Sequence, residues 1–250
     1  INGFELVWKM RDQAEKFGAR VENATVERVD FSGEVKKLFC GDGLVFEAKK
    51  VIIATGSAPR MTGAKGESEM YGGKGVSACA TCDGAFYRNK DVLVIGGGDT
   101  AAEEADFLTR FCSSVTLVHR RDQLRASKIM ADRVMANPKV KIIWDSVLQE
   151  VLPNDSGICR GAILKNVKTG ELSEIPCSGV FVAIGHTPNT KAFEGAVEMD
   201  AEGYIIPKNG SPVKTSAENV FVAGDCSDKV FRQAITAAAM GCMAGITASA

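Results

Sequence analysis

The sequence predicts an α/β protein built around a nucleotide-binding βαβ unit, on three observations within one stretch. Residues 92–95 are a short apolar run, which favours a buried strand. The run leads into Gly96-Gly97-Gly98-Asp99-Thr100-Ala101, a G-x-G-x-x-A pattern. Residues 101–111 then carry apolar side chains at helical spacing, and residues 115–118 are a second apolar run.

Each residue type in the glycine pattern suits a bound pyrophosphate. Gly96 permits the tight turn, Gly98 lets the backbone approach the phosphates, and Ala101 lets the helix pack closely on the strand. Asp99 and Thr100 open the helix, whose N-terminus offers free N–H groups and a partial positive charge to an anion. We therefore predict a dinucleotide site formed by these residues, with Asp99 capping the helix.

The residues after the second strand select the cofactor. Sites that prefer NAD place an acid there, roughly 20 residues past the glycines. This chain has His119, Arg120 and Arg121 at that place, followed by Arg125. Because guanidinium groups bind phosphate in a forked geometry, the cluster favours the 2′-phosphate of NADPH. The alternative is a solvated basic turn.

A C-x-x-C element, Cys79 and Cys82 followed by Asp83, precedes this unit and has three interpretations. A zinc site needs about four ligands, whereas the other cysteines are scattered singly, at Cys40, Cys112, Cys159, Cys177, Cys226 and Cys242. Two unrelated core cysteines are the second interpretation. We favour the third, a redox dithiol with no metal, in which Asp83 exchanges protons with a thiolate. Since a nicotinamide delivers a hydride, a flavin is expected to couple it to the disulfide.

Composition limits the classes of partner. The 250 residues carry a net charge of −1, which predicts neither nucleic-acid nor anionic-membrane binding. Eight cysteines without an even framework indicate a reducing compartment, and residues 1–17 lack a signal-peptide layout, so a cytoplasmic location is expected. Residues 234–250 are uncharged but small and slightly short for a span, which predicts a helix packed closely inside the protein.

Periodicity and turn residues predict the remaining elements. Residues 57–74 are rich in Gly, Ser, Pro and charge and are expected to form a linker and a surface loop. Helices are expected at residues 4–17, 126–135 and 234–250. Strands are expected at residues 21–29, 36–40, 44–48, 51–53, 140–144, 147–152, 161–167, 171–175, 179–184, 203–206 and 220–223.

Several motifs in order resemble one family. They are residues 77–84 (SACATCDG), 96–101 (GGGDTA), 119–122 (HRRD), 185–189 (GHTPN), 224–225 (GD) and 232–234 (RQA). Together they resemble the low-molecular-weight thioredoxin reductases of bacteria, plants and fungi. The resemblance implies two Rossmann-like three-layer dinucleotide-binding domains. The NADPH domain, residues 61–189, is inserted into a partial FAD-binding domain formed by residues 1–60 and 190–250.

The resemblance also implies roles that the residues alone leave open. Ala54, Thr55 and Gly56 end a strand that passes close to FAD. Asp225 accepts a hydrogen bond from the FAD ribityl chain, and Arg232, Gln233 and Ala234 open a helix beside the flavin. Gly185 and His186 lie near the nicotinamide, at the return crossing to the first domain. Without the family, His186 is equally a turn histidine and Asp225 an ordinary strand-end acid.

The implied mechanism passes electrons from NADPH through FAD to the Cys79–Cys82 disulfide and on to thioredoxin. Cys82 faces the flavin, Cys79 attacks the partner disulfide, and Asp83 is the acid–base group. The domains are expected to rotate about residues 57–63 and 186–190, and the family is usually homodimeric.

Only one dinucleotide fingerprint is present, because residues 1–75 contain no Gly-x-Gly turn between a strand and a helix. We expect the chain to be a piece of a longer reductase; the alternative is a short protein without tight FAD binding. Asp99 and Cys226 depart from the usual family residues, and we expect Cys226 to be a packing residue. Rival functions are a related dithiol flavoreductase, such as an alkyl hydroperoxide reductase subunit or a ferredoxin-fed enzyme, or a non-catalytic NADPH-binding module.

Overall fold

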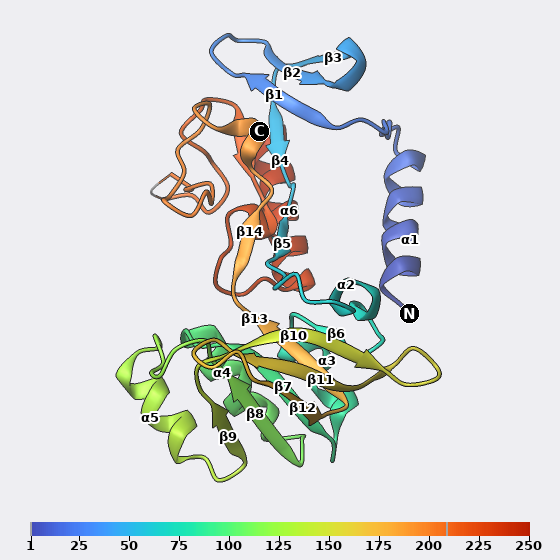
Figure 1. Ribbon diagram of the computed structural model, residues 1–250. Helices are drawn as coiled ribbons and strands as arrows, with labels where there is room; N and C mark the ends of the chain where they lie inside the picture. The colour runs from blue at the N-terminus through green and yellow to red at the C-terminus, as the bar shows by residue number, and fades with distance from the viewer. Residues whose placement is uncertain (1, 209) are drawn as a thin grey trace. The chain divides into compact units, whose positions relative to one another are not determined.

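The computed structural model describes residues 2–208 and 210–250. The chain forms two compact units (Figure 1). The first unit takes the chain up to Ser57 and again from Pro188 to Ala250, and the second unit is Ala58–Thr187. The second unit is therefore an insertion in the chain of the first.

A parallel sheet forms the centre of the second unit. Its strand order is β6-β13-β7-β8-β9, and every neighbouring pair is parallel. The strands are β6 (Val76–Ser77), β7 (Asp91–Gly96), β8 (Ser114–Val118), β9 (Val140–Ile143) and β13 (Gly179–Ala183). The strand order reverses beside β7, so the predicted βαβ unit lies at a switch point of a doubly wound sheet, where such folds bind ligands.

Two different layers cover the faces of the parallel sheet (Figure 1), and alternate residues of β7 pack with one or the other. Val92 and Val94 pack with the helices α4 (Asp99–Leu108) and α5 (Lys128–Ala136). Leu93 and Ile95 pack with an antiparallel sheet on the other face. That sheet consists of β10 (Ser146–Pro153), β11 (Cys159–Asn166) and β12 (Leu172–Pro176). The result is the three-layer architecture that the two faces of a buried strand require.

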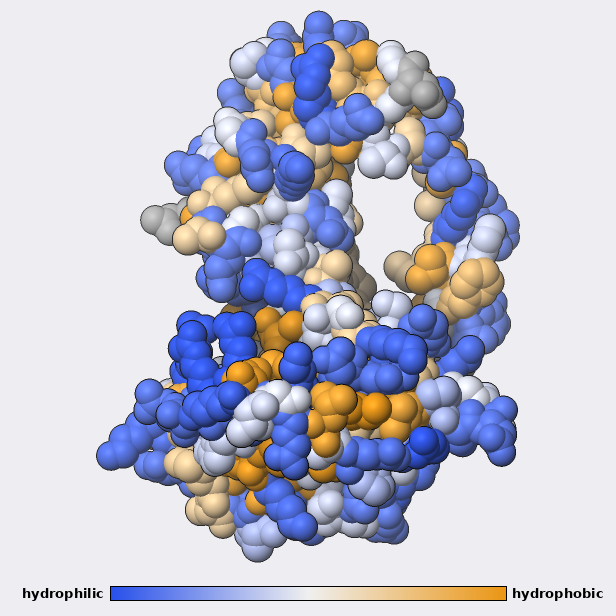
Figure 2. Space-filling model, in the orientation of Figure 1, coloured by the Kyte–Doolittle hydropathy of each residue, from blue (hydrophilic) through white to orange (hydrophobic). Residues whose placement is uncertain are grey.

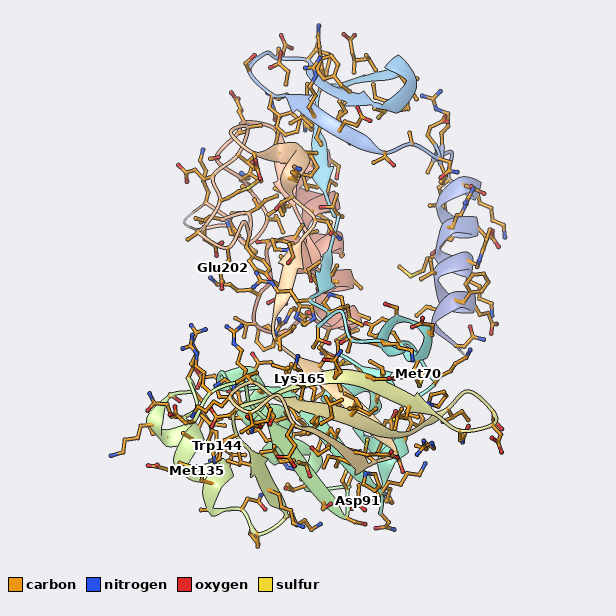
Figure 3. The ribbon with its side chains drawn as sticks, in the orientation of Figure 1. Met70, Asp91, Met135, Trp144, Lys165 and Glu202 are labelled. Carbon is orange, nitrogen blue, oxygen red and sulfur yellow. A yellow bond between two sulfur atoms is a disulfide. The ribbon has the colours of Figure 1, made fainter. Side chains whose placement is uncertain are left out.

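Residues 57–74 are not the surface loop that their composition predicts. They contain β5 (Ser57–Pro59) and α2 (Glu67–Met70), and Glu67 and Met70 are buried. Glu67 Oε1 accepts from the Thr62 amide and hydroxyl at 3.0 and 2.9 Å, and Oε2 accepts from the Gly63 amide at 2.8 Å. The prediction failed because a carboxylate with three donors can be buried, while Met70, beside the antiparallel sheet (Figure 3), joins the core that also contains Leu148 and Val151 of β10.

The first unit has a parallel pair and a small antiparallel sheet. The pair is β4 (Val51–Ile53) and β15 (Val220–Val222), and the sheet is β1 (Val26–Asp30), β2 (Lys36–Cys40) and β3 (Val45–Ala48). Phe31 and Phe193 join the core around β4 and β15. Cys226 is fully buried there, as the packing interpretation expects.

Residues 203–206 do not form the predicted strand. They make only an isolated bridge between Met199 and Ile205. The Asp200 carboxylate accepts from the amides of Glu202 and Tyr204. This local turn holds the backbone groups that a strand would pair with a neighbour.

Two helices of the first unit expose most of their surface. α1 (Gly3–Lys16) buries no residue, and α6 (Ala234–Ser249) buries only Ala244. Both helices confirm the predicted secondary structure. The expectation that residues 234–250 pack closely inside the protein is wrong for the described chain, since Ile235 is 78% exposed and Ile246 67%. Neither these helices nor any other in the described residues is both long and apolar enough to cross a membrane.

Short helical turns complete the described chain. They are α3 (Ala80–Asp83), η1 (Gly41–Gly43), η2 (Gly84–Tyr87), η3 (Lys191–Phe193) and η4 (Gly224–Cys226). In the space-filling view, hydrophilic residues cover α5 and an apolar band crosses the antiparallel sheet of the second unit (Figure 2). The two predicted hinge segments pair with each other, as β5 and β14 (His186–Pro188).

Candidate active site and nucleotide sites

Cys79 and Cys82 are joined as a disulfide. Cys79 caps the single turn α3, and its Sγ accepts from the Cys82 amide at 3.2 Å. The Ser77 hydroxyl accepts from the Cys79 amide at 3.0 Å, which fixes the start of the turn. Cys82 is exposed and Cys79 half-buried. A disulfide in reach of solvent on a tight turn fits the redox-dithiol interpretation.

Asp83 closes the same turn, and its amide donates to the Cys79 carbonyl at 3.1 Å. Tyr87, which the sequence did not single out, lies close enough for the two groups to interact. Burial raises the pKa of Tyr87 to about 12, and the Asp83 charge adds to the effect. The neutral Tyr87 ring packs edge-on against Phe181, with centroids 5.2 Å apart. A Cβ on Gly179 would lie 2.3 Å from that ring, so the Tyr87 ring packs directly on the backbone of β13. This contact holds the segment after the dithiol against β13.

The glycine loop divides into packing glycines and an open one. A Cβ on Gly96 would lie 2.4 Å from the Ala183 oxygen. A Cβ on Gly97 would lie 2.1 Å from Nδ1 of His119, whereas a Cβ on Gly98 would meet nothing within 4 Å. Gly96 and Gly97 therefore serve close packing, and Gly98 leaves open space above the start of α4. That space fits the approach of a pyrophosphate to the helix N-terminus.

Asp99 does not cap α4. Gly98 is the N-cap residue and makes no side-chain cap, while Asp99 Oδ1 accepts from the Ser127 amide at 2.8 Å. Hydrogen bonds from Ser127 hold the pKa of Asp99 below its usual range. The cap prediction failed because Ser127, the residue before α5, approaches from 28 positions along the chain. Asp99 therefore joins the starts of α4 and α5.

The basic cluster contains one buried residue and three exposed ones. His119 is 5% exposed and lies under Gly97, with Trp144 edge-on at 6.4 Å between ring centroids. Burial lowers the pKa of His119, and the neighbouring arginines lower it further, so the imidazole is neutral at pH 7. Arg120, Arg121 and Arg125 are exposed, and the Arg125 amide donates to the Gly97 carbonyl. The structure thus brings the backbone of Arg125 to the glycine loop and places His119 as a support beneath it.

A pocket of about 400 Å³ lies in the first unit, where β4 and β15 end and α6 begins. It is lined by Ala54, Gly56, Ala223, Gly224, Asp225, Gln233, Ala234, Ala237 and Gly241. Small residues and one carboxylate suit a flat ring system with a polar tail, and the volume is in the range of ligand pockets. Five predicted flavin residues line it, namely Ala54, Gly56, Asp225, Gln233 and Ala234, whereas Thr55 and Arg232 do not. Ala237 and Gly241 also line the pocket; neither was predicted, although their helical spacing from Ala234 could have indicated them.

The two acids beside this pocket behave oppositely. Burial raises the pKa of Asp225, and the nearby Asp228 raises it further. Burial also acts on Asp228, but amide donors including Phe231 and Val230 outweigh it and hold the Asp228 pKa low. Gln233 caps α6 in a reciprocal box with Thr236, so α6 begins at the predicted place. Asp225 is therefore the pocket acid whose charge is poorly compensated by the protein.

The model of the pyridine nucleotide-disulphide oxidoreductase family matches residues 4–241. The fold, the disulfide and both candidate nucleotide sites agree with that class of flavoenzymes. A thioredoxin reductase of Streptomyces coelicolor is 51% identical over 99% of this chain and 76% of its own length. One from Rickettsia typhi is 48% identical over 98% of this chain and 79% of its own length. The chain belongs to the thioredoxin reductase family, whose cofactors are FAD and NADPH.

Solved structures agree. The thioredoxin reductase of Streptococcus pyogenes superposes with a TM-score of 0.92 at 43% identity, covering 100% of this chain and 80% of that one. The enzyme of Giardia duodenalis gives 0.93 at 39% identity, covering 100% and 81%. These similarities confirm the family predicted from the motifs and the α/β fold with two Rossmann-like domains.

Proposed function

We propose that this chain reduces the disulfide of thioredoxin with electrons from NADPH, through FAD and the Cys79–Cys82 pair. The observation that carries the proposal is the disulfide at Cys79 and Cys82 on the unit that also holds the glycine loop and the three arginines. The relatives named thioredoxin reductase support the choice of partner.

The dithiol makes and breaks disulfides by exchange. After two-electron reduction, the Cys79 thiolate attacks one sulfur of the thioredoxin disulfide and the other sulfur leaves as a thiolate. Cys82 then attacks Cys79 in the mixed disulfide, which releases the reduced partner and restores the Cys79–Cys82 bond. Asp83 gives and takes the proton at the Cys82 sulfur. Bound FAD supplies two-electron transfer between the nicotinamide and this disulfide.

We assign NADPH to the second unit. Gly96 and Gly98 with the start of α4, at Asp99, Thr100 and Ala101, receive the pyrophosphate. Arg120, Arg121 and Arg125 bind the 2′-phosphate. His119 supports the loop from below, and Gly185 and His186 lie on the path toward the nicotinamide.

We assign FAD to the pocket at the ends of β4 and β15. The assignment makes residues 1–60 and 190–250 part of an FAD-binding domain and residues 61–189 the NADPH-binding domain. Ala54, Gly56, Gln233 and Ala234 provide the wall, and Asp225 accepts from a hydroxyl of the flavin side chain. Thr55 and Arg232 do not line this pocket, and we keep them as proposed flavin contacts.

We further propose a homodimer in a reducing, cytoplasmic setting. The free cysteines Cys40, Cys112, Cys159, Cys177 and Cys226 are buried, which agrees with an environment that keeps thiols reduced. Light scattering on the flavin-loaded protein tests the assembly, and a monomer mass contradicts the dimer.

The central test compares Cys82→Ser with Cys242→Ser, which changes an exposed cysteine outside the site. Oxidised thioredoxin and NADPH are added to the flavin-loaded full chain. We expect Cys82→Ser to lower turnover by at least about 1,000-fold, because single-group removal from a unit of this kind abolishes its chemistry. Cys242→Ser keeps the parent rate, and both variants bind NADPH normally. Parent-like turnover by Cys82→Ser contradicts the proposal, and absence of flavin bands favours a non-catalytic module.

The nucleotide assignment has its own test. Arg120→Ala with Arg121→Ala removes two phosphate donors, while Arg133→Ala changes an exposed arginine on α5. We expect the double variant to weaken NADPH binding by at least about 100-fold and NADH binding little, since charged hydrogen bonds contribute roughly 1.5–3 kcal/mol each, or about 3 kcal/mol or more for two. An unchanged ratio of the two affinities overturns the assignment, and an NADH preference in the parent points to an alkyl hydroperoxide reductase subunit.

A further inference from the structure

Two buried cysteines outside the redox disulfide face each other in the second unit. Cys159 begins β11 and Cys177 follows β12. Their Sγ atoms are 4.0 Å apart, and the residues are 5% and 6% exposed. The proposed reduction of thioredoxin uses neither of them.

The backbone already holds the two residues as neighbours on adjacent strands. β11 and β12 are antiparallel, Gly161 pairs with Pro176, and the Cys177 amide donates to the Arg160 carbonyl at 3.3 Å. A disulfide has its sulfurs about 2.05 Å apart. From 4.0 Å the sulfurs need to approach by only about 2 Å, which side-chain rotation can provide without unpairing the strands.

The two thiols are not equivalent. A hydrogen bond from Cys177 lowers the pKa of Cys159, while the same bond and burial raise the pKa of Cys177. In the resting pair the Cys159 thiol donates to the carbonyl oxygens of Gly161 and Cys177, each at 3.7 Å. Because its pKa is the lower of the two, Cys159 loses its proton first and acts as the nucleophile, and Cys177 is the neighbouring thiol that resolves its oxidation product.

We propose that Cys159 and Cys177 form a second redox dithiol, which hydrogen peroxide oxidises to a disulfide. The Cys159 thiolate attacks one peroxide oxygen, the O–O bond breaks, and hydroxide leaves, so that Cys159 becomes a sulfenic acid. The Cys177 sulfur then attacks the Cys159 sulfur, and the S–O bond breaks as the S–S bond forms. The departing hydroxide takes the Cys177 proton and leaves as water. Two thiols and one peroxide give one disulfide and two waters.

The position of the pair favours a small oxidant. Ile158, Arg160 and Pro176, next to the two cysteines in sequence, are exposed, so the thiols lie just below the surface at the end of the sheet. The Cys159 amide donates to the Lys74 carbonyl at 2.8 Å. A Cβ on Gly75 would lie 2.3 Å from the Cys159 Cβ. The pair therefore packs against the chain that runs through β6 to Cys79.

The sequence allows a direct test on the full chain. Cleavage after Lys and Arg places Cys159 in residues 142–160 and Cys177 in residues 169–191, each as the only cysteine. The redox disulfide falls in residues 75–88 and Cys112 in residues 111–120. Cys112 is the internal control, since it is buried and burial raises its pKa to about 11.

The protein is treated with hydrogen peroxide, denatured, alkylated and digested without reduction. We expect a cross-linked peptide 142–160/169–191, two hydrogen masses lighter than the sum of its parts, to form at least about tenfold faster than Cys112 is oxidised. Recovery of both peptides alkylated, or oxidation of Cys112 at the same rate, overturns the proposal. The readout needs neither NADPH nor flavin, so its failure is separate from failure of the proposed function.

Single variants test the assigned order. In Cys177→Ser, Cys159 is expected to stop at the sulfenic acid, which dimedone traps on residues 142–160. In Cys159→Ser, Cys177 is expected to stay a thiol. Trapping on Cys177 instead reverses the order and overturns that assignment. If a variant does not fold, the cross-link in the parent protein still decides the proposal.

Discussion

Helices α4 and α1 are stabilised in different ways in the two units. α4 buries Ala101, Ala102, Ala105 and Leu108, whereas α1 buries nothing. Yet α1 is the better-formed helix locally: Asn2 accepts from the Glu5 amide, and Lys9 pairs with Glu5 at 2.7 Å. α4 has no side-chain cap, so packing on the sheet of the second unit stabilises it, whereas a cap and spaced charges stabilise α1, which buries no residue in the described chain.

The difference in burial between α4 and α1 is tested most directly by the pair of variants with the largest expected effect. Leu108→Ala removes a fully buried side chain and is expected to lower the free energy of unfolding by about 2–5 kcal/mol. Leu6→Ala on α1, at 45% exposure, is expected to change it by less than about 0.5 kcal/mol. Urea unfolding measures both, and an equal loss for Leu6→Ala shows that α1 is packed in solution.

The glycine loop gives the next effect. Gly97→Ala places a methyl group on the His119 ring and is expected to cost about 1–3 kcal/mol of stability. Gly98→Ala has open space and is expected to fold like the parent but to bind NADPH about tenfold more weakly, since the methyl group occupies the approach to the pyrophosphate. Thermal unfolding and NADPH titration separate the two outcomes. Equal stability losses contradict the division into packing and open glycines.

Glu67 tests whether the polar segment before β6 is part of the core. Glu67→Gln presents an amide N–H to donors at Thr62 or Gly63, so we expect a loss of roughly 1–2 kcal/mol. Glu69→Gln changes the exposed acid of the same turn and is expected to be neutral. Similar stability of the two variants in urea contradicts a buried role for Glu67.

The smallest effect concerns the acids beside the pocket of the first unit. Folding raises the pKa of Asp225, so its stabilising contribution exists at low pH and is lost as pH rises through the folded value. Asp225→Asn is therefore expected to stabilise the flavin-free protein at pH 7 by less than about 1 kcal/mol, with no gain near pH 3.5.

Asp228 is the matched control with the opposite sign. Its lowered pKa gives stability above the usual carboxyl pKa that is lost as pH falls. Asp228→Asn is expected to destabilise at pH 7 and to destabilise less near pH 3.5, where this contribution has begun to be lost. Unfolding midpoints at both pH values check the pair, and shifts of the same sign contradict the assignment.

The strands that the sequence predicted best are those formed by continuous apolar runs. Runs of apolar residues located β7, β8 and β13 to within a residue or two, because strands buried on both faces admit little else. The disulfide between Cys79 and Cys82 also followed from the spacing of the two cysteines. The predicted cofactor-contact roles of individual site residues stay predictions.

The predictions that failed depend on the surroundings of a residue, which its type and local pattern do not reveal. Ser127 captures Asp99 from 28 positions away, and no local pattern distinguishes that bond from a cap. Glu67 looks like a surface acid until Thr62 and Gly63 turn their donors toward it. The small residues of α6 predict close packing, but the described chain covers only Ala244. In each case the residue type was evident from the sequence, but the groups around that residue in the fold were not.

The pairing of β5 with β14 brings the two ends of the second unit together. The Arg60 amide donates to the Gly185 carbonyl at 2.9 Å, so the chain enters and leaves the second unit at the same place. A segment whose two ends are hydrogen-bonded to each other can be cut out and closed with a short linker at little entropic cost. Residues 58–187 thus form a unit that could be moved to another protein as one piece. This piece contains both the glycine loop and the Cys79–Cys82 disulfide.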